Sequence, residues 1–153
     1  MIPKRVVLDT NVCLDLFVFR DPRWGLLHDA LKNGCLEAIT RDDCRKEWSI
    51  VLHYPHLKLD DAARMVCMAE FDSLIRSHSV PDAMEEIQKL PICKDKDDQK
   101  FLEIARDARV DVLITKDKAL LKLARKTRRD GLFAIMTPEA WTMEATALPQ
   151  VAE

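Results

Sequence analysis

The chain has 153 residues, the size of one ordinary domain, with 24 basic and 26 acidic side chains and a net charge of −2 at pH 7. Its content of 48% hydrophobic and 33% charged residues is typical of a folded globular protein and excludes a disordered chain. No apolar stretch approaches the roughly 20 residues that a membrane span needs, so we expect no membrane partner.

Short apolar runs alternate with longer helical patterns along the chain. In order, the pattern predicts a strand at 4–9, helices within 12–32, a strand at 35–39, helices at 41–52 and 59–77, a weak extended piece at 78–81, a helix at 97–108, a strand at 111–115, a helix at 117–128, a strand at 132–136 and a final helix. Such alternation is typical of parallel strands joined by helical crossovers. We therefore predict a single-domain α/β/α sandwich with a central, mostly parallel sheet over residues 1–147, followed by a C-terminal tail at 148–153.

Two acids end predicted strands. Asp9 follows the apolar run Val6-Val7-Leu8, and Asp117 closely follows the run Val112-Leu113-Ile114-Thr115. Ligands of open α/β sheets bind outside the carboxyl ends of the strands, where both acids are expected to lie.

Two further acids lie on the predicted inner face of helices. Asp98 precedes Phe101 by three residues and Leu102 by four, and Glu47 follows Cys44 by three. These spacings place both acids on the apolar side of their helices. In the acidic run around Asp98, Asp95 or Asp97 is expected to cap the helix, with Asp95 also a candidate for supporting the site.

Each of these acids also has a local explanation, as a turn residue, a helix cap or a solvated side chain. Together, however, they would bring four like charges to one end of the sheet, which costs several kcal/mol without compensation. The four acids therefore predict a divalent-cation site, consisting of Asp9, Glu47, Asp98 and Asp117.

Positive charge gathers between residues 116 and 129, which hold seven basic residues and one acid. Several of them are spaced to share one solvated face, but a phosphate backbone would also favour them beside a metal site. The predicted RNA contacts are Lys116, Lys118, Lys122, Arg125 and Lys126.

The cysteines and glycines limit which cofactors and which cellular compartment the sequence predicts. The five cysteines lack C-x-x-C spacing, which predicts free thiols in a reducing, cytoplasmic compartment and argues against a zinc site. The three glycines form neither a Walker loop nor a G-x-G-x-x-G turn, which excludes nucleotide triphosphate hydrolysis and dinucleotide cofactors. The N-terminus runs directly into a strand, so we expect no signal peptide.

The motifs together resemble the PIN-domain family over nearly the whole length of the chain. The resemblance rests on Leu8-Asp9-Thr10-Asn11-Val12, the isolated acid Glu47, Asp95-x-x-Asp98-x-x-Phe101-Leu102-x-x-Ala105 and Leu113-Ile114-Thr115-x-Asp117. The segment Met136-Thr137-Pro138-Glu139 resembles the tail of PIN proteins described as toxins of toxin–antitoxin pairs. Lys116, where a small residue is common, and Leu121, where some members have an acid, are departures from the pattern.

This resemblance implies a Mg²⁺- or Mn²⁺-dependent endoribonuclease that acts on single-stranded RNA. It also implies that Asp9, Glu47, Asp98 and Asp117 form an acidic quartet, which Asn11 and Thr115 support through hydrogen bonds. An antitoxin protein and a second copy of the chain, in a homodimer, are the further candidate partners.

The chemistry of the quartet agrees with that implication. Carboxylate oxygens suit Mg²⁺ and Mn²⁺, and two such ions, typically about 3.5–4 Å apart, activate a water and stabilise the leaving oxygen. Asp9 is the candidate bridging ligand, with Asp98 and Asp117 on either side. Glu47 either binds directly or orients the attacking water.

Two other functions stay open. A phosphohydrolase with an aspartyl nucleophile usually needs a second acid two residues on, and position 11 is asparagine. A catalytically weak PIN-like module that only binds RNA or a protein is the other alternative, and the intact quartet argues against it.

Overall fold

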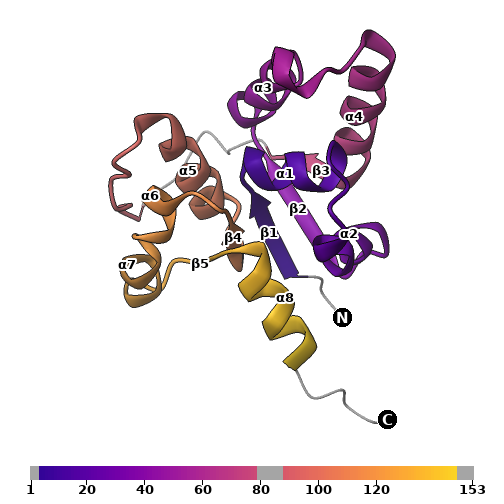
Figure 1. Ribbon diagram of the computed structural model, residues 1–153. Coiled ribbons are helices and arrows are strands. Elements are labelled where there is room, and N and C mark those ends of the chain that lie inside the picture. Colours follow the sequence, from indigo (N-terminus) through magenta and orange to yellow (C-terminus); the bar gives the residue numbers. More distant parts are fainter. Residues whose placement is uncertain (1–3, 79–87, 148–153) are drawn as a thin grey trace.

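The computed structural model describes residues 4–78 and 88–147 as a five-stranded sheet with helices on both sides (Figure 1). The strands are β1 (Lys4–Leu8), β2 (Leu36–Thr40), β3 (Ile75–Ser77), β4 (Val112–Ile114) and β5 (Ala134–Met136). The α-helices are α1 (Thr10–Phe17), α2 (Gly25–Lys32), α3 (Asp42–Val51), α4 (Asp61–Leu74), α5 (Gln99–Asp107), α6 (Lys118–Leu121), α7 (Ala124–Arg129) and α8 (Pro138–Ala147). Three short 3₁₀ helices are η1 (Pro22–Trp24), η2 (Pro55–Leu57) and η3 (Lys96–Asp98).

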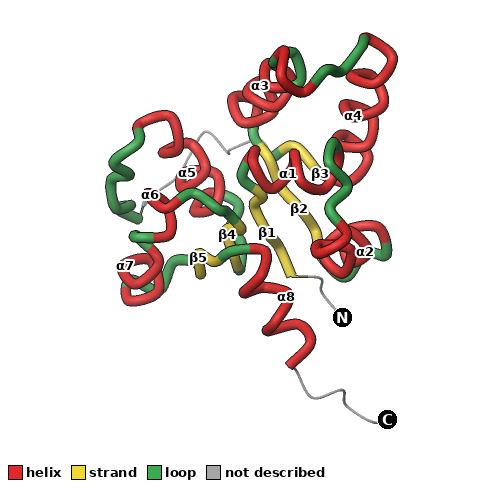
Figure 2. Tube along the Cα trace, viewed as in Figure 1, coloured by secondary structure: helices red, strands yellow, loops and turns green. Residues whose placement is uncertain are grey.

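All four strand pairs are parallel, in the order β3-β2-β1-β4-β5, which confirms the predicted α/β/α sandwich. The chain builds outward from β1 to β2 and β3, then crosses to the other side of β1 for β4 and β5 (Figure 2). The neighbouring strands β1 and β4 therefore mark the point where the strand order reverses, and ligands of open parallel sheets bind at the carboxyl ends of the strands at such a point. The register Leu8↔Ile114 brings the residues that follow β1 and β4 to the same edge.

Successive side chains of the strands pack into two separate hydrophobic cores, one on each face of the sheet. Val6, Leu8 and Ile114 pack with residues of α1, α2 and α4, whereas Val7 and Leu113 pack with residues of α5 and the segment around α6 and α7. Successive strand residues point to opposite faces, so a strand covered on both sides is apolar throughout. In Figure 1, α2 and α4 lie to the right of β1 and α3 lies above it, whereas α5, α6 and α7 lie to its left.

An aromatic cluster holds α3 beside the carboxyl end of β1. Trp48 of α3 stacks on Phe71 of α4 with 5.5 Å between ring centroids, and Phe17 of α1 meets both rings edge-on. Such pairs add to the free energy gained by burying the rings. Because Glu47 directly precedes the buried Trp48, this packing also sets where Glu47 lies.

The prediction of a helix over 59–77 is wrong at its end. α4 ends at Leu74, and Ile75 to Ser77 form β3, which pairs with β2 in the register Ala38↔Ile75. Phe71 and Ile75 are four residues apart and both buried, so the helical period continues into the strand and hides the boundary. Of the extended piece predicted at 78–81, only His78 lies within the described residues, and it is not part of a strand.

The single helix predicted over 117–128 is also wrong, because the segment forms two short helices, α6 and α7. Between them the amide of Leu123 donates to the carbonyl of Leu120 at 3.0 Å, three residues back rather than four. This tighter turn lets Leu120 and Leu123 both reach the second core.

Two further predictions concern the C-terminal tail and membrane spans. The predicted tail, 148–153, lies outside them. Within 4–78 and 88–147, no helix is long and apolar enough to cross a membrane.

Candidate metal centre

Asp9 is the buried anchor of the site, with only 4% of its surface exposed. One carboxylate oxygen accepts from the amide of Thr10 at 2.7 Å, so Asp9 caps α1. The other accepts from the hydroxyl of Thr115 at 2.6 Å, and the amide of Asp9 donates to the carbonyl of Ile114 at 3.0 Å. Asp9 thus joins the ends of β1 and β4.

Thr115 supports two acids with one hydroxyl group. Its oxygen donates to Asp9 and accepts from the amide of Asp117 at 3.0 Å. Asp117 in turn accepts from the amide of Ala119 at 2.9 Å and caps α6. The predicted supporting role of Thr115 therefore has a direct counterpart in the structure.

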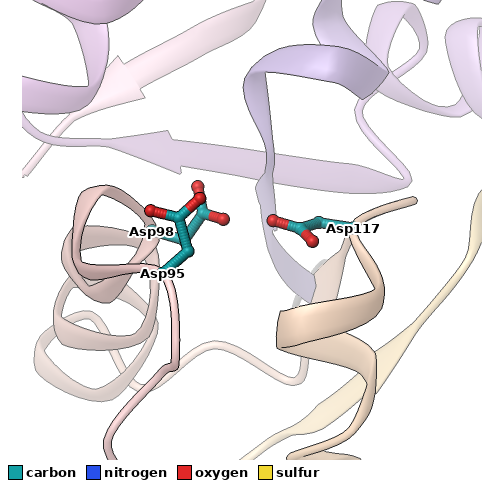
Figure 3. A group of neighbouring side chains, drawn as sticks. All are labelled: Asp95, Asp98 and Asp117. Carbon is teal, nitrogen blue, oxygen red and sulfur yellow. The ribbon is translucent and has the colours of Figure 1, made fainter.

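Asp117, which follows β4, faces two acids of the segment ahead of α5 (Figure 3). Asp95, Asp98 and Asp117 each present a carboxylate oxygen, and these oxygens lie within 4.8 Å of one another. Figure 3 shows Asp95 and Asp98 next to each other ahead of α5, with Asp117 turned toward them from the loop ahead of α6. We call Asp95, Asp98 and Asp117 the acidic triad.

The carboxylates of the triad repel one another, which perturbs their pKa values. Burial, the hydrogen bond with Asp117 and the charges of Asp9, Asp117 and Asp95 together raise the pKa of Asp98 to about 8, with burial as the largest cause. The same hydrogen bond from Asp98 lowers the pKa of Asp117. Ionisation of one carboxylate therefore opposes ionisation of the other, because neighbouring like charges repel.

Asp9 is perturbed in the same direction. Burial, the largest cause, and the charges of Glu47 and Asp117 raise its pKa, the hydrogen bonds from Thr115 and Thr10 oppose that rise, and the resulting pKa is about 6. Asp9 is therefore close enough to both acids to be affected by their charge. Perturbed carboxylates that converge on one place are typical of functional sites.

Glu47 borders the triad without belonging to it. One of its oxygens accepts from the hydroxyl of Thr10, and the other lies 3.2 Å from the amino group of Lys100. Of the predicted quartet, the structure thus brings Asp98 and Asp117 together directly, with Asp9 and Glu47 beside them.

The donor set of the triad fits a hard divalent cation. Its three acids offer carboxylate oxygens, which Mg²⁺ and Mn²⁺ prefer, and a bound cation would relieve the repulsion between Asp98 and Asp117. All five cysteines are free thiols, and none belongs to the triad.

Other predicted site residues behave differently from expectation. The side chain of Asn11 makes no hydrogen bond to the quartet within the described residues, and its oxygen is buried without a partner. Lys116, predicted to contact RNA, lies 2.7 Å from the buried Asp15 of α1. The other four predicted RNA contacts, Lys118, Lys122, Arg125 and Lys126, are exposed.

The sequence predicted that Asp95 supports the site and that Asp98 binds the metal, whereas the structure places both in the triad. Asp95 also caps η3 by accepting from the amide of Asp97 at 3.0 Å, as one of the two expected caps. The three-residue spacing of Asp95 and Asp98 was the signal, since it places the two on one side of a helical turn. No such signal marked Lys100 or Asp15.

A hollow of about 760 Å³ lies away from these acids, beside Arg109, Arg128 and Phe133. Its lining residues precede β4 and begin β5, so it opens at the amino ends of these strands. The acids lie at the carboxyl ends, and the hollow is therefore separate from the metal centre.

Comparison with known families agrees with this geometry. The sequence pattern of the PIN domain matches residues 5–119, about three quarters of the chain. The chain belongs to the PIN-domain family. No curated protein matches it. PIN domains are typically metal-dependent nucleases that use divalent cations, and in this PIN domain the acidic triad lies within the matched residues.

Proposed function

We propose that this PIN domain is a Mg²⁺- or Mn²⁺-dependent endoribonuclease that cleaves single-stranded RNA by two-metal hydrolysis. The observation that carries the proposal is the acidic triad beside the buried Asp9, at the reversal point of a parallel sheet. The choice of RNA over other phosphodiesters rests on the resemblance of the motifs and on the basic residues of α6 and α7.

Asp95, Asp98 and Asp117 would hold one cation, and Asp9 and Glu47 are the candidates for a second. Bound cations of this kind activate a water and stabilise the charge that develops on the leaving oxygen. Thr115 and Thr10 keep Asp9 fixed through its two hydrogen bonds, so the site is organised before substrate arrives. Glu47 either binds the second cation or orients the attacking water.

A digest of mixed RNA tests the reaction. The purified protein should cut single-stranded RNA with Mn²⁺ and stop when EDTA is added. Asp98→Asn removes the negative charge of one triad carboxylate and should lower the rate of RNA cleavage by roughly a thousandfold or more. Asp97→Asn is the matched control, because Asp97 is its exposed neighbour and lies outside the triad.

The control should cut at the parental rate. Equal rates for Asp98→Asn and the parent would remove the triad from the mechanism. RNA binding without cutting in any divalent cation would favour the inactive binding module, and metal-dependent hydrolysis of phosphomonoesters alone would favour a phosphohydrolase.

The proposed RNA path follows the exposed bases of α6 and α7. Lys122 and Lys126 would each contact a phosphate, which positions RNA without reading its sequence. Replacing both with Met should weaken binding about equally for all sequences and flatten its salt dependence by nearly two phosphate contacts. Replacing the exposed Lys32 and Lys58, which lie outside α6 and α7, is the control and should change neither quantity.

Unchanged affinity and an unchanged salt slope in the Lys122 and Lys126 double variant would show that these side chains are only solvated. The RNA path would then have to run elsewhere. Cleavage of bound RNA should be largely retained in this variant, because both side chains lie outside the acidic triad.

We further propose that this nuclease is the toxin of a toxin–antitoxin pair in the cytoplasm, acting as a homodimer. The support is the resemblance of Met136-Thr137-Pro138-Glu139 to the tail of such toxins. Expression in a bacterial host should arrest growth, Asp98→Asn should not, and the protein encoded beside it should restore growth. Continued growth with active nuclease present would overturn the toxin role alone.

A further inference from the structure

Lys100 holds an enclosed position beside the metal centre. It is the second residue of α5, and its side chain is only 17% exposed. Its amino group donates to Glu47 at 3.2 Å and to the carbonyl of Asp97, and lies 5.1 Å from the centre of the Phe101 ring. Three separate contacts fix the ammonium group, unlike that of a freely solvated lysine.

Among the described residues, Glu47 is the one acid of the centre with a basic partner. Within residues 4–78 and 88–147, Lys100 pairs with Glu47, whereas no Lys or Arg nitrogen lies within 4.0 Å of the Asp9, Asp95, Asp98 or Asp117 carboxylates. Both oxygens of Glu47 are engaged, one by Lys100 and one by Thr10. The centre therefore separates into an uncompensated triad and a neutralised Glu47.

A second divalent cation and Lys100 would compete for the same carboxylate. Two positive groups on one partly buried acid repel each other, and repulsion is poorly screened where solvent is scarce. In the RNA-free protein, the Asp97 carbonyl and the Phe101 ring hold Lys100 beside Glu47.

We propose that Lys100 is the counter-ion that keeps Glu47 out of metal binding in the RNA-free protein. The free protein then holds one divalent cation, on the triad, and a second binds with RNA, whose phosphate offers the ammonium group another anion. This inference rests on the proposed function and specifies when its second cation enters. Lys100 is in this sense a positioning residue.

Calorimetric titration of the EDTA-stripped, RNA-free protein with MnCl₂ tests the inference. The parent should bind one ion. Lys100→Met keeps an aliphatic chain over Phe101 but frees Glu47, and should bind two ions. Lys96→Met is the matched control, because Lys96 is an exposed lysine between Asp95 and Asp97 that does not contact Glu47, and should bind one.

The double variant Lys100→Met with Glu47→Gln should return to one ion, since the freed carboxylate is then missing. Circular dichroism confirms folding of each variant, and Lys100→Gln replaces Lys100→Met if the latter does not fold. The affinity of the first ion should change less than about threefold between the parent and Lys100→Met, because the triad is intact.

Two ions bound by the parent, or a single ion bound by folded Lys100→Met, would overturn the role of Lys100 and leave the proposed nuclease standing. Binding of no Mn²⁺ by any variant would overturn the proposed function and this inference with it. A second ion in both Lys100→Met and Lys96→Met would mean that local charge, and not the contact with Glu47, sets the number of ions.

Discussion

Replacing Asp9 with Asn should stabilise the metal-free protein while abolishing its proposed activity. Asp9 is buried, and its pKa is raised from 3.8 to about 6, chiefly by burial. A carboxylate whose pKa is higher in the folded state favours the fold when protonated and opposes it when ionised. This destabilisation is absent below the unfolded pKa, grows between pH 4 and 6, and is complete above the folded pKa.

The magnitude follows from the same two values. The rise from 3.8 to about 6 means that ionised Asp9 opposes folding by about 3 kcal/mol at pH 7.5. Asn keeps an oxygen that accepts from the amide of Thr10 but no longer accepts from Thr115. Loss of the Thr115 hydrogen bond costs about 1 kcal/mol of stability. The net gain is about 2 kcal/mol, equivalent to about 4–8 °C in Tm for a chain of this size.

Urea unfolding with EDTA, at pH 7.5 and pH 4.5, measures this difference. The gain should be about 2 kcal/mol at pH 7.5 and near zero at pH 4.5, where the penalty from Asp9 has fallen to about 1 kcal/mol and only offsets the lost hydrogen bond from Thr115. Asp29→Asn is the control, because it neutralises an exposed acid and should stay within about 0.5 kcal/mol of the parent at both pH values.

A destabilised Asp9→Asn at pH 7.5, or a difference independent of pH, would refute the reasoning about burial and charge. Nuclease activity is a separate readout. Loss of transition-state stabilisation should lower the rate of RNA cleavage roughly a thousandfold in the stabilised variant.

Three further predictions concern the neighbouring contacts. The pKa of Asp98 is raised to about 8, chiefly by burial, so Mn²⁺ must displace a proton when it binds. The affinity of the protein for Mn²⁺ should therefore rise about tenfold from pH 6 to pH 7 and level off above pH 8. Titration calorimetry across this pH range measures the affinity, and a constant value would contradict the prediction. Lys116→Met should destabilise the protein by about 1–3 kcal/mol by leaving buried Asp15 unpaired, and adding Asp15→Asn should restore most of the loss in a urea-unfolding cycle. Thr115→Val should cost about 1–3 kcal/mol, because Asp9 and the amide of Asp117 both lose a partner, while Thr115→Ser should keep the parental stability to within about 1 kcal/mol in the same assay.

The sequence by itself determined the class of fold and the approximate positions of β1, β2, β4 and β5. Apolar runs such as Val6-Val7-Leu8 are readable because a strand covered on both faces has no polar side. Asp9 and Asp117 could be placed for the same reason, since each follows such a run. The face of Asp98 was readable because the helical period is local.

Only the tertiary structure decided which strand and helix ends were real and which side chains met. β3 exists through its pairing with β2, although the local pattern continues the helix before it. The break between α6 and α7 likewise follows from packing Leu120 and Leu123 against the second core.

The contacts of the site itself join residues far apart in the chain. Lys100 contacts Glu47, which is 53 positions earlier in the chain, and Lys116 contacts Asp15 of α1. A sequence period records which face of an element is apolar, but it carries no information on the partner that this face meets. That choice depends on how β1 and β4 are paired, because their register brings the two halves of the site together.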